Sequence, residues 1–198
     1  MGLSSIEAYD LVADEYDHFY SRPGHLLENA ALIEILRGAG LLAVGKHILD
    51  LGCGTGSVIV PHADNQHYTG LDGSEGMLVL ARRRFAAARF QRWRWGEDFP
   101  VSDGCMDVVL SIFGAFNYAA DPLRAFEEVR RVLRAGGRFF LMITTAESEV
   151  LVANGLKVQR CAYEPLNLLQ LIRKVEGLRA TIIPFSARHY VLAGRKHD

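Results

Sequence analysis

A glycine-rich segment, His47-Ile-Leu-Asp-Leu-Gly-Cys-Gly-Thr-Gly56, restricts the fold of this chain more than any other stretch. Residues 48–51 have the apolar character of a buried strand end, and glycines follow at positions 52, 54 and 56. Glycine permits a tight turn and lets a ligand lie against bare backbone. If residues 57–60 open a helix, its first N–H groups are unpaired as well. The segment therefore predicts a strand, a turn and a helix that together form a ligand cradle.

Two details of this cradle distinguish between cofactor classes. A dinucleotide site needs Gly-x-Gly-x-x-Gly, so that pyrophosphate reaches the start of the helix. Here the third glycine, Gly56, comes one residue early, and Ser57 stands at the expected position. Asp50 lies directly before the loop, where its charge would repel pyrophosphate but would suit a ligand that carries an ammonium group. A tight strand–helix turn without a ligand is the remaining interpretation.

Part of this segment, Leu49-Asp-Leu-Gly-Cys-Gly-Thr-Gly, resembles the first motif of the class I S-adenosylmethionine (SAM) dependent methyltransferases. The strings Asp72-Gly-Ser-Glu-Gly-Met-Leu and Glu128-Val-Arg-Arg-Val-Leu-Arg-Ala-Gly-Gly are similar to that family too. The resemblance covers residues 9–195. It implies an α/β fold, a Rossmann-like three-layer sandwich with a seven-stranded, mostly parallel sheet whose last strand is antiparallel. We expect one methyltransferase domain over residues 1–198, with residues 1–40 as an N-terminal helical cap.

The order of apolar segments points to the same fold class. Their spacing predicts helices over residues 6–20, 25–36, 74–88, 164–175 and from 121 to the glycines at 136–137. It predicts strands over residues 48–51, 67–71, 90–95, 107–113, 138–144, 179–184 and 189–193. Strands that alternate with helices are typical of a sandwich with a largely parallel sheet.

Charge and cysteine content exclude several function classes. A formal net charge of -1 gives no overall attraction to nucleic acid or to an anionic membrane. Three cysteines argue against a disulfide framework, and their spacing matches no zinc pattern. We see neither a signal region nor an apolar run of the roughly 18 residues that a membrane span needs. We expect a cytoplasmic protein with no metal, no nucleic-acid partner and no membrane partner.

Two local features have a competing interpretation. Arginines at positions 82, 83, 84, 89, 92 and 94, together with two tryptophans, could form a basic aromatic patch for nucleic acid. A solvated helix face followed by an alternating strand is the favoured explanation. Cys53 is a candidate nucleophile by residue type, but it belongs to the first motif and no adjacent residue would activate it.

The resemblance also implies a set of cofactor contacts. Asp72 stands at a strand end about 20 residues past the loop, where a carboxylate can accept both ribose hydroxyls of SAM or NAD. Its alternative role is that of a turn or cap residue. The predicted cofactor-binding residues are Tyr16, Tyr20, Arg22, Asp50, Gly52, Cys53, Gly54, Gly56, Asp72, Gly73, Met77, Trp95, Gly96, Glu97 and Ser111. We expect Asp50 at the methionine ammonium, Met77 near the adenine, and Tyr16, Tyr20 and Arg22 around the methionine end.

Trp95 is the main departure from the family pattern. It occupies the position where the family usually has an acidic residue that contacts the adenine amino group. We expect backbone groups of Gly96 and Glu97 to recognise adenine instead, with Glu97 or Asp98 as substitute carboxylates. Trp95 then either stacks on the base or belongs to the core.

Methyl transfer from a sulfonium needs alignment and exclusion of water more than it needs a catalytic triad. The acceptor-side candidates are His18, His25, Asn117 and Tyr118, in a pocket walled by the N-terminal helices and by residues 113–118 and 144–155. The sequence therefore predicts a SAM-dependent methyltransferase, with S-adenosylhomocysteine (SAH) as product and a small-molecule acceptor. Its aromatic walls weakly favour an apolar or aromatic acceptor. The alternatives are a non-catalytic SAM- or SAH-binding protein and, less favoured, an NAD-dependent oxidoreductase; we expect a monomer or homodimer.

Overall fold

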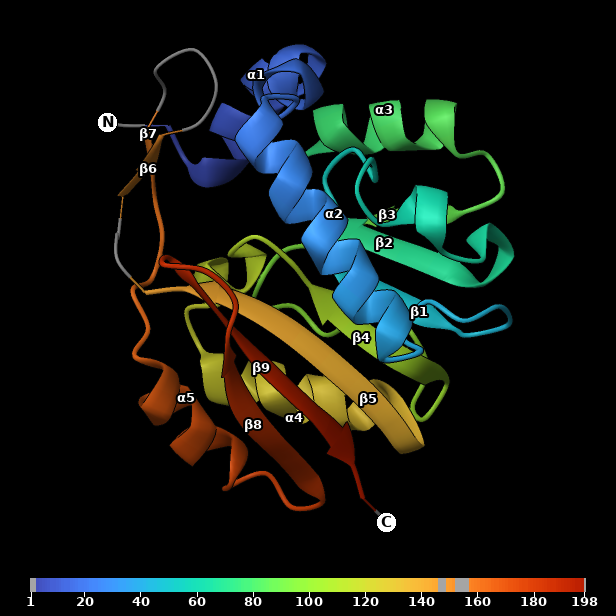
Figure 1. The fold of residues 1–198 in the computed structure, drawn as a ribbon, viewed down its shortest axis with the longest axis vertical. Helices are drawn as coiled ribbons and strands as arrows, with labels where there is room; N and C mark the ends of the chain where they lie inside the picture. Colours follow the sequence, from blue (N-terminus) through green and yellow to red (C-terminus); the bar gives the residue numbers. More distant parts are fainter. Residues whose placement is uncertain (1–2, 146–148, 152–156, 198) are drawn as a thin grey trace.

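The computed structural model describes residues 3–145, 149–151 and 157–197, and its centre is a seven-stranded sheet (Figure 1). The strands lie in the order β3-β2-β1-β4-β5-β9-β8. Their bounds are β1 (Ile48–Leu51), β2 (Tyr68–Asp72), β3 (Arg89–Arg92), β4 (Met106–Ser111), β5 (Leu133–Thr144), β8 (Leu178–Pro184) and β9 (His189–Lys196). Two further strands, β6 (Glu149–Leu151) and β7 (Lys157–Gln159), form a separate antiparallel pair.

All neighbouring pairs from β3 to β5 are parallel, and β9 is antiparallel to both β5 and β8. The predicted fold, a mostly parallel Rossmann-like sheet with an antiparallel last strand, is confirmed. Side chains of successive residues alternate between two cores: Leu49 and Val109 lie on one face, Ile48 and Val108 on the other. Burial on both faces explains why these strands are continuous apolar runs in the sequence.

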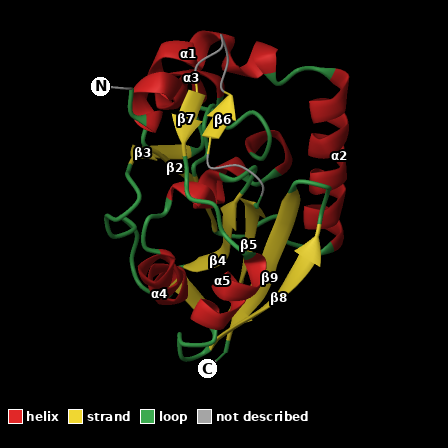
Figure 2. Cartoon of the chain, turned by 90° about the vertical axis from the view of Figure 1, so that its left-hand side faces the viewer, coloured by secondary structure: helices red, strands yellow, loops and turns green. Residues whose placement is uncertain are grey.

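Helices cover the two faces of this sheet. Helix α2 (Pro23–Gly38) packs Leu32, Ile33 and Leu36 onto the face that carries Ile48 and Val108. Helices α4 (Pro122–Val132) and α5 (Pro165–Ile172) cover the opposite face, as the two views show (Figures 1 and 2). Helix α2 is thus part of the sandwich over most of its length, and within the predicted helical cap of residues 1–40 it is mainly α1 that covers the strand ends.

Helix α1 (Ser5–Phe19) lies at the end of the molecule opposite the C-terminus, beside α3 (Glu75–Arg84) and β7 (Figure 2). It begins with a capping box: Ser4 accepts the N–H of Glu7, and the Glu7 carboxylate accepts the N–H of Ser4. Its buried Ala8 and Val12 contact Val158 of β7. The helix therefore covers the edge of the sheet at which the parallel strands end.

Two expectations about local structure are wrong, and one pair of strands was missed. No α-helix follows the glycine loop; only a 3₁₀ turn forms at Val60–His62, since Pro61 lacks an N–H and disfavours helical geometry in the residue before it. Helix α4 ends at Val132 rather than at the glycines, and β5 starts at the next residue. The β6–β7 pair was not foreseen from the sequence at all. Within the described residues, no helix combines the length and apolarity that crossing a membrane requires.

Candidate functional site

A cavity of about 670 Å³ lies at the carboxyl ends of β1, β2 and β4. These ends meet at one edge of the sheet because the three strands are parallel neighbours, and ligands of open α/β sheets bind in such a place. Helix α1 closes the cavity from the side of Ser5, Ile6 and Tyr9. The predicted residues that line it are Tyr16, Asp50, Gly52, Cys53, Gly54, Asp72, Gly73, Met77, Trp95, Asn117 and Tyr118.

Asp50 is buried on β1 with one carboxylate oxygen unsatisfied. Its Oδ2 accepts a hydrogen bond of 2.6 Å from the Tyr68 hydroxyl, whereas Oδ1 has no partner among the described residues. Burial raises the pKa of Asp50 to about 7, although the Tyr68 bond opposes the shift and the charge of Asp72 adds to it. A buried acceptor without a partner is costly. An ammonium group of a ligand in this cavity would satisfy it.

Glycine is needed at each of the three loop positions for a different structural reason. Gly54 adopts a φ of +55°, and a Cβ at this position would point into open space, with no atom within 4 Å. Gly52 instead allows a close approach, because its Cβ would lie 2.4 Å from that of Ala115. Gly56 does not line the cavity; a Cβ there would contact Val60 and Phe85. Bare backbone at Gly54 therefore faces the space that a ligand would fill.

Asp72 is the last residue of β2 and connects the glycine loop to the next helix. Its carboxylate accepts the N–H of Gly54 at 2.8 Å and that of Ser74, the N-cap of α3, at 2.9 Å. Burial raises the pKa of Asp72, while these two backbone bonds oppose the shift. Each oxygen keeps a further lone pair for a ligand hydroxyl. Asp72 therefore acts as a turn residue and still lies on the cavity wall.

The wall beyond β3 is aromatic rather than acidic. Trp95 is half-buried on the cavity and packs edge-on against Trp93 and Phe116, with ring centroids 4.8 and 5.5 Å apart. Gly96 and Glu97 are exposed and do not line the cavity; the Glu97 carboxylate accepts the N–H of Arg94. The geometry therefore gives no support to adenine contacts from Gly96 or Glu97, and it leaves Trp95 as a wall residue.

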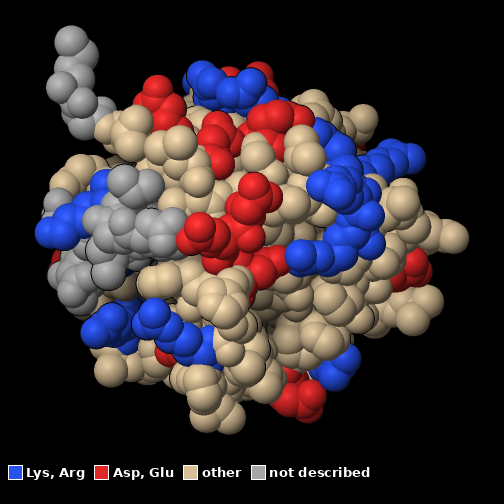
Figure 3. Space-filling model, turned by 90° about the horizontal axis from the view of Figure 1, so that it is seen from above, with Lys and Arg blue, Asp and Glu red and all other residues tan. Residues whose placement is uncertain are grey.

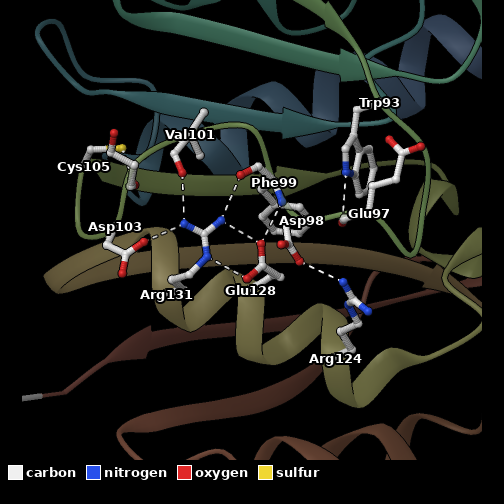
Figure 4. Close-up of polar contacts among 11 residues, drawn as sticks. Trp93, Glu97, Asp98, Phe99, Val101, Asp103, Cys105, Arg124, Glu128 and Arg131 are labelled. Atoms are coloured by element: carbon white, nitrogen blue, oxygen red, sulfur yellow. Dashed lines mark hydrogen bonds and ion pairs between the residues drawn. The ribbon is translucent and has the colours of Figure 1, made fainter.

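Contacts with helix α4 explain why this loop turns away from the cavity (Figure 4). The Arg131 guanidinium donates to the carbonyl of Phe99 at 2.9 Å and to the carboxylate of Glu128. Glu128 in turn accepts the N–H of Phe99 at 2.7 Å. Asp98, predicted as a substitute carboxylate, forms an ion pair with Arg124. Residues of α4 therefore hold the acidic part of the loop on the outer side of the sandwich.

A second cavity of about 690 Å³ adjoins the first. The two share several wall residues, among them Tyr9, Tyr16, Phe113 and Tyr118. The hydroxyls of Tyr9 and Tyr118 lie 3.1 Å apart, and burial raises the pKa of Tyr9, so this phenol stays neutral. Helices α1 and α2 supply further wall residues, including the predicted Tyr20 and His25. An aromatic space therefore opens directly beside the glycine-loop cavity.

Besides Gly56, Gly96 and Glu97, three predicted residues lie outside both cavities. Arg22 is exposed, with its guanidinium 4.8 Å from the centroid of the Phe19 ring. His18 is exposed on α1. Ser111 is fully buried, and its hydroxyl donates to the carbonyl of Leu51 at 3.0 Å, so it links β4 to β1. The expected contacts of Arg22 and Ser111 with the cofactor, and of His18 with the acceptor, have no geometric support.

Asn117 lies at the cavity wall, but both the nitrogen and the oxygen of its amide form hydrogen bonds with backbone groups. Its Nδ2 donates to the carbonyls of Thr144 and Cys161 at 2.8 and 2.7 Å. Its Oδ1 accepts the N–H of Thr144 at 2.9 Å. Asn117 therefore holds two chain segments together, and the predicted role in acceptor chemistry gains no support.

Several wall residues escaped the sequence analysis. Trp93 and Arg160 line the first cavity, and His189, the first residue of β9, lines the second. An antiparallel last strand starts at the edge where the parallel strands end, so the predicted topology already contained the signal for His189. Of the expected wall formed by residues 144–155, positions 146–148 and 152–155 lie outside the described residues.

The two competing interpretations of local features gain nothing from the structure. Burial raises the pKa of the Cys53 thiol, and the nearby Asp72 and Asp50 add to the effect, so this thiol stays protonated. Trp93 is buried and unavailable for stacking on bases. Arg82 and Arg84 form ion pairs with Glu75 and Asp17, and on the face seen in Figure 3 groups of acidic side chains lie beside the groups of basic ones.

Comparisons with known proteins agree with this geometry. Residues 48–137 match a family model described as a methyltransferase domain. The chain is 32% identical over 165 residues to a demethylmenaquinone methyltransferase of Clavibacter sepedonicus, covering 80% of the chain and 66% of the relative. It is 35% identical over 133 residues to the chloroplastic 2-methyl-6-phytyl-1,4-hydroquinone methyltransferase 1 of Oryza sativa subsp. japonica, covering 65% and 39%. The CcbJ methyltransferase of Streptomyces caelestis shares the fold, with a TM-score of 0.71 at 18% identity over 94% of this chain and 96% of that one.

The chain therefore belongs to the class I SAM-dependent methyltransferase family, as its motifs predicted. The cofactor of this family is SAM, and the residues fit it: Asp50 Oδ1 lacks a partner, and bare backbone at Gly54 faces the cavity. These matches give no support to an NAD-dependent oxidoreductase. The chain spans only 66% and 39% of the length of the two relatives described above.

Proposed function

We propose that this chain catalyses the transfer of a methyl group from SAM to a small-molecule acceptor. The observation that carries the proposal is the unpartnered Oδ1 of Asp50 in a cavity that shares its wall with a second, aromatic one. The first cavity offers a place for the cofactor, and the second a place for the acceptor. The methyl group goes to an oxygen, a nitrogen or a carbon atom of the acceptor.

The residues of the first cavity have separate tasks in this proposal. Bound SAM supplies a methyl group on a positively charged sulfur, which is already activated for in-line displacement. Asp50 holds the amino acid end by its free oxygen, Gly54 gives room for contact with backbone, and Asp72 offers lone pairs to the ribose. Tyr16 and Tyr118, shared by both cavities, exclude water at the junction.

The size and walls of the second cavity support a small acceptor. A volume of about 690 Å³ suits a drug-sized molecule, and rings from α1, α2 and the β4 loop surround it. The two relatives are named as methyltransferases of a demethylmenaquinone and of a 2-methyl-6-phytyl-1,4-hydroquinone. We further propose a cytoplasmic monomer or homodimer; the three cysteines are free, as a reducing compartment requires.

Calorimetric titration with SAH, with NADH in parallel, tests the cofactor half of the proposal. We expect SAH to bind and NADH not to bind. Asp50→Asn should lower the affinity for SAH at least tenfold at pH 8. A mass-spectrometric screen of phenols, amines and thiols with SAM tests the acceptor half. Absence of SAH binding refutes the proposal. SAH binding without a methylated product from any class would favour the non-catalytic SAM-binding alternative.

A further inference from the structure

His189 and Thr144 form a polar pair at the edge of the second cavity. Thr144 is the last residue of β5, and His189 is the first residue of the antiparallel β9, directly opposite it in register. Residues opposite each other in an antiparallel pair have Cβ atoms about 5 Å apart and point to the same face. Both residues line the second cavity. The topology therefore brings an imidazole and a hydroxyl together at the sheet edge that carries the cofactor loops.

The Thr144 hydroxyl is buried and has no hydrogen-bond partner among the described residues, although Thr144 is only 3% exposed. The backbone of the same residue is fixed, because the Asn117 amide pairs with both its N–H and its carbonyl. A buried hydroxyl without a partner costs free energy unless a ligand completes it. Its position on the cavity wall makes an acceptor molecule the natural partner.

The His189 ring is held by one nitrogen only. Its Nδ1 lies 3.0 Å from the Ser186 hydroxyl, while Nε2 makes no hydrogen bond with the described residues. Burial lowers the pKa of His189; Glu28 of α2 opposes the shift, and the cations Arg160 and Arg188 add to it. The imidazole is thus neutral at neutral pH. If Nδ1 donates its proton to Ser186, Nε2 carries the free lone pair.

We propose that His189 is the general base for an acceptor hydroxyl on a flat ring, with the Thr144 hydroxyl donating a hydrogen bond to the same oxygen. This inference rests on the function proposed above and deepens it. The acceptor O–H bond breaks and its proton goes to Nε2 of His189. The oxygen forms a bond to the methyl carbon, the carbon–sulfur bond breaks with its electron pair on sulfur, and the imidazolium then loses its proton to water.

The shape of the cavity favours a flat acceptor. Phe113 packs its ring edge-on against His189, with centroids 6.0 Å apart, and it lines both cavities. It is the one non-glycine residue with a positive φ, +50°, among the described residues. Such backbone strain persists only where surrounding contacts enforce it, and it is concentrated at functional sites. The aromatic rings of Phe113 and Tyr118 therefore form walls of the cavity beside the polar pair.

The test uses 4-nitrophenol as probe, because its phenolate absorbs visible light, with 4-nitroanisole as the matched ligand that has no acidic proton. In protein saturated with SAH, we expect the apparent pKa of bound 4-nitrophenol to be at least one unit lower in wild type than in His189→Gln. Thr144→Val should raise that pKa in the same direction by a smaller amount. 4-Nitroanisole should bind wild type and His189→Gln equally.

With SAM, kcat for methylation of 4-nitrophenol should fall at least 100-fold in His189→Gln, within the usual range for loss of a general base. The affinity for SAH should not change. His18→Gln is the matched control, since His18 is exposed and outside both cavities, and it should behave as wild type. SAH binding, measured separately, shows whether each variant is folded.

Two results would overturn the inference while the proposed function stands. In the first, SAH binds but 4-nitrophenol does not bind the SAH complex. In the second, the bound probe has the same apparent pKa in wild type and in His189→Gln. Loss of SAH binding by wild type would instead refute the proposed function itself.

Discussion

Replacement of Asp50 by asparagine should stabilise the free protein at alkaline pH and weaken the binding of SAH. In the structure this carboxyl is buried, and the one hydrogen bond that it receives from the described residues, from Tyr68, does not compensate for lost hydration. Burial raises its pKa from 3.8 to about 7. The folded protein therefore disfavours the ionised form that exists above this pKa. Asparagine has nearly the same shape, keeps an acceptor for Tyr68, and carries no charge.

The direction in which stability changes with pH follows from proton linkage. Because the pKa of Asp50 is higher in the folded chain than in the unfolded one, stability is greatest below pH 3.8 and falls as the pH rises to about 7. A shift of about three units corresponds to roughly 4 kcal/mol at pH 8.5. The new amide N–H₂ has no evident partner and costs about 1–3 kcal/mol. The net gain of Asp50→Asn at pH 8.5 is thus about 1–3 kcal/mol.

The free-energy cost of the unpaired amide does not depend on pH, so it cancels when the stabilities at two pH values are compared. Between pH 5 and pH 8.5, the stability of Asp50→Asn relative to wild type should rise by about 3 kcal/mol. For a chain of 198 residues this equals roughly 6–12 °C in Tm, which scanning calorimetry without ligand can measure. Asp107→Asn is the pH-independent control, because the carboxyl of Asp107 is ionised in both the folded and the unfolded chain between pH 5 and pH 8.5. Burial raises the pKa of Asp107, but the His47 N–H and Lys46 outweigh this and hold it below its usual range.

A Tm of Asp50→Asn relative to wild type that does not change with pH, or that changes by the same amount in Asp107→Asn, would refute this reasoning. Ligand binding provides an independent check. An ammonium at Oδ1 favours the ionised carboxylate, so at pH 6 SAH binding should release close to one proton from wild type and none from Asp50→Asn. Titrations in buffers with different ionisation enthalpies measure this number. Tyr68→Phe should increase the release at pH 7, because its hydroxyl lowers the pKa of Asp50.

Two further predictions concern the glycine loop and the β3–β4 loop. Gly54→Ala should lower the affinity for SAH at least tenfold in calorimetry, because the added Cβ enters the cavity. The control is Gly45→Ala, where the backbone has a similar positive φ but lies away from the cavity. This variant should only lose about 1–2 kcal/mol of stability. Equal SAH affinity in both variants would contradict the assignment of the cradle. Arg131→Ala should lower the free energy of unfolding in urea by about 2–4 kcal/mol, because it leaves Glu128 and loop carbonyls unpaired. Arg124→Ala removes one exposed ion pair and should cost less than about 1 kcal/mol.

The sheet and the glycine cradle were predictable from the sequence because their signals are local. Each buried strand is a short apolar run, and such runs alternating with helices predict a largely parallel sheet. The antiparallel last strand was implied only by the family resemblance. The position of Asp50 before the glycines was informative for the same reason: a strand end fixes where its side chain lies. The assignments of Gly52, Gly54 and Asp72 to the cavity needed only this adjacency.

The errors arise where tertiary contacts decide the outcome. Gly96 and Glu97 follow β3 as an adenine-contacting segment should, yet contacts between Arg131 of α4 and Phe99 draw this loop outward. Arg22 follows α1 in sequence, but the helix ends with this side chain in solvent. Asn117 has the polarity of an acceptor-side residue, and its amide is occupied by backbone from 27 and 44 residues further along. No local pattern reveals such partners.

Reversal of the last strand has a consequence for chemistry as well as for topology. In a purely parallel sheet, residues at the carboxyl edge come only from strand ends and the loops that follow them. Because β9 runs the other way, its first residue, His189, stands at that edge opposite Thr144, the last residue of β5. The β8–β9 turn also brings Ser186 to the ring. The reversed strand thereby places a neutral imidazole on the wall of the second cavity, at the start of a β-strand rather than within a loop. A general base of the kind proposed above keeps its geometry best on such an element.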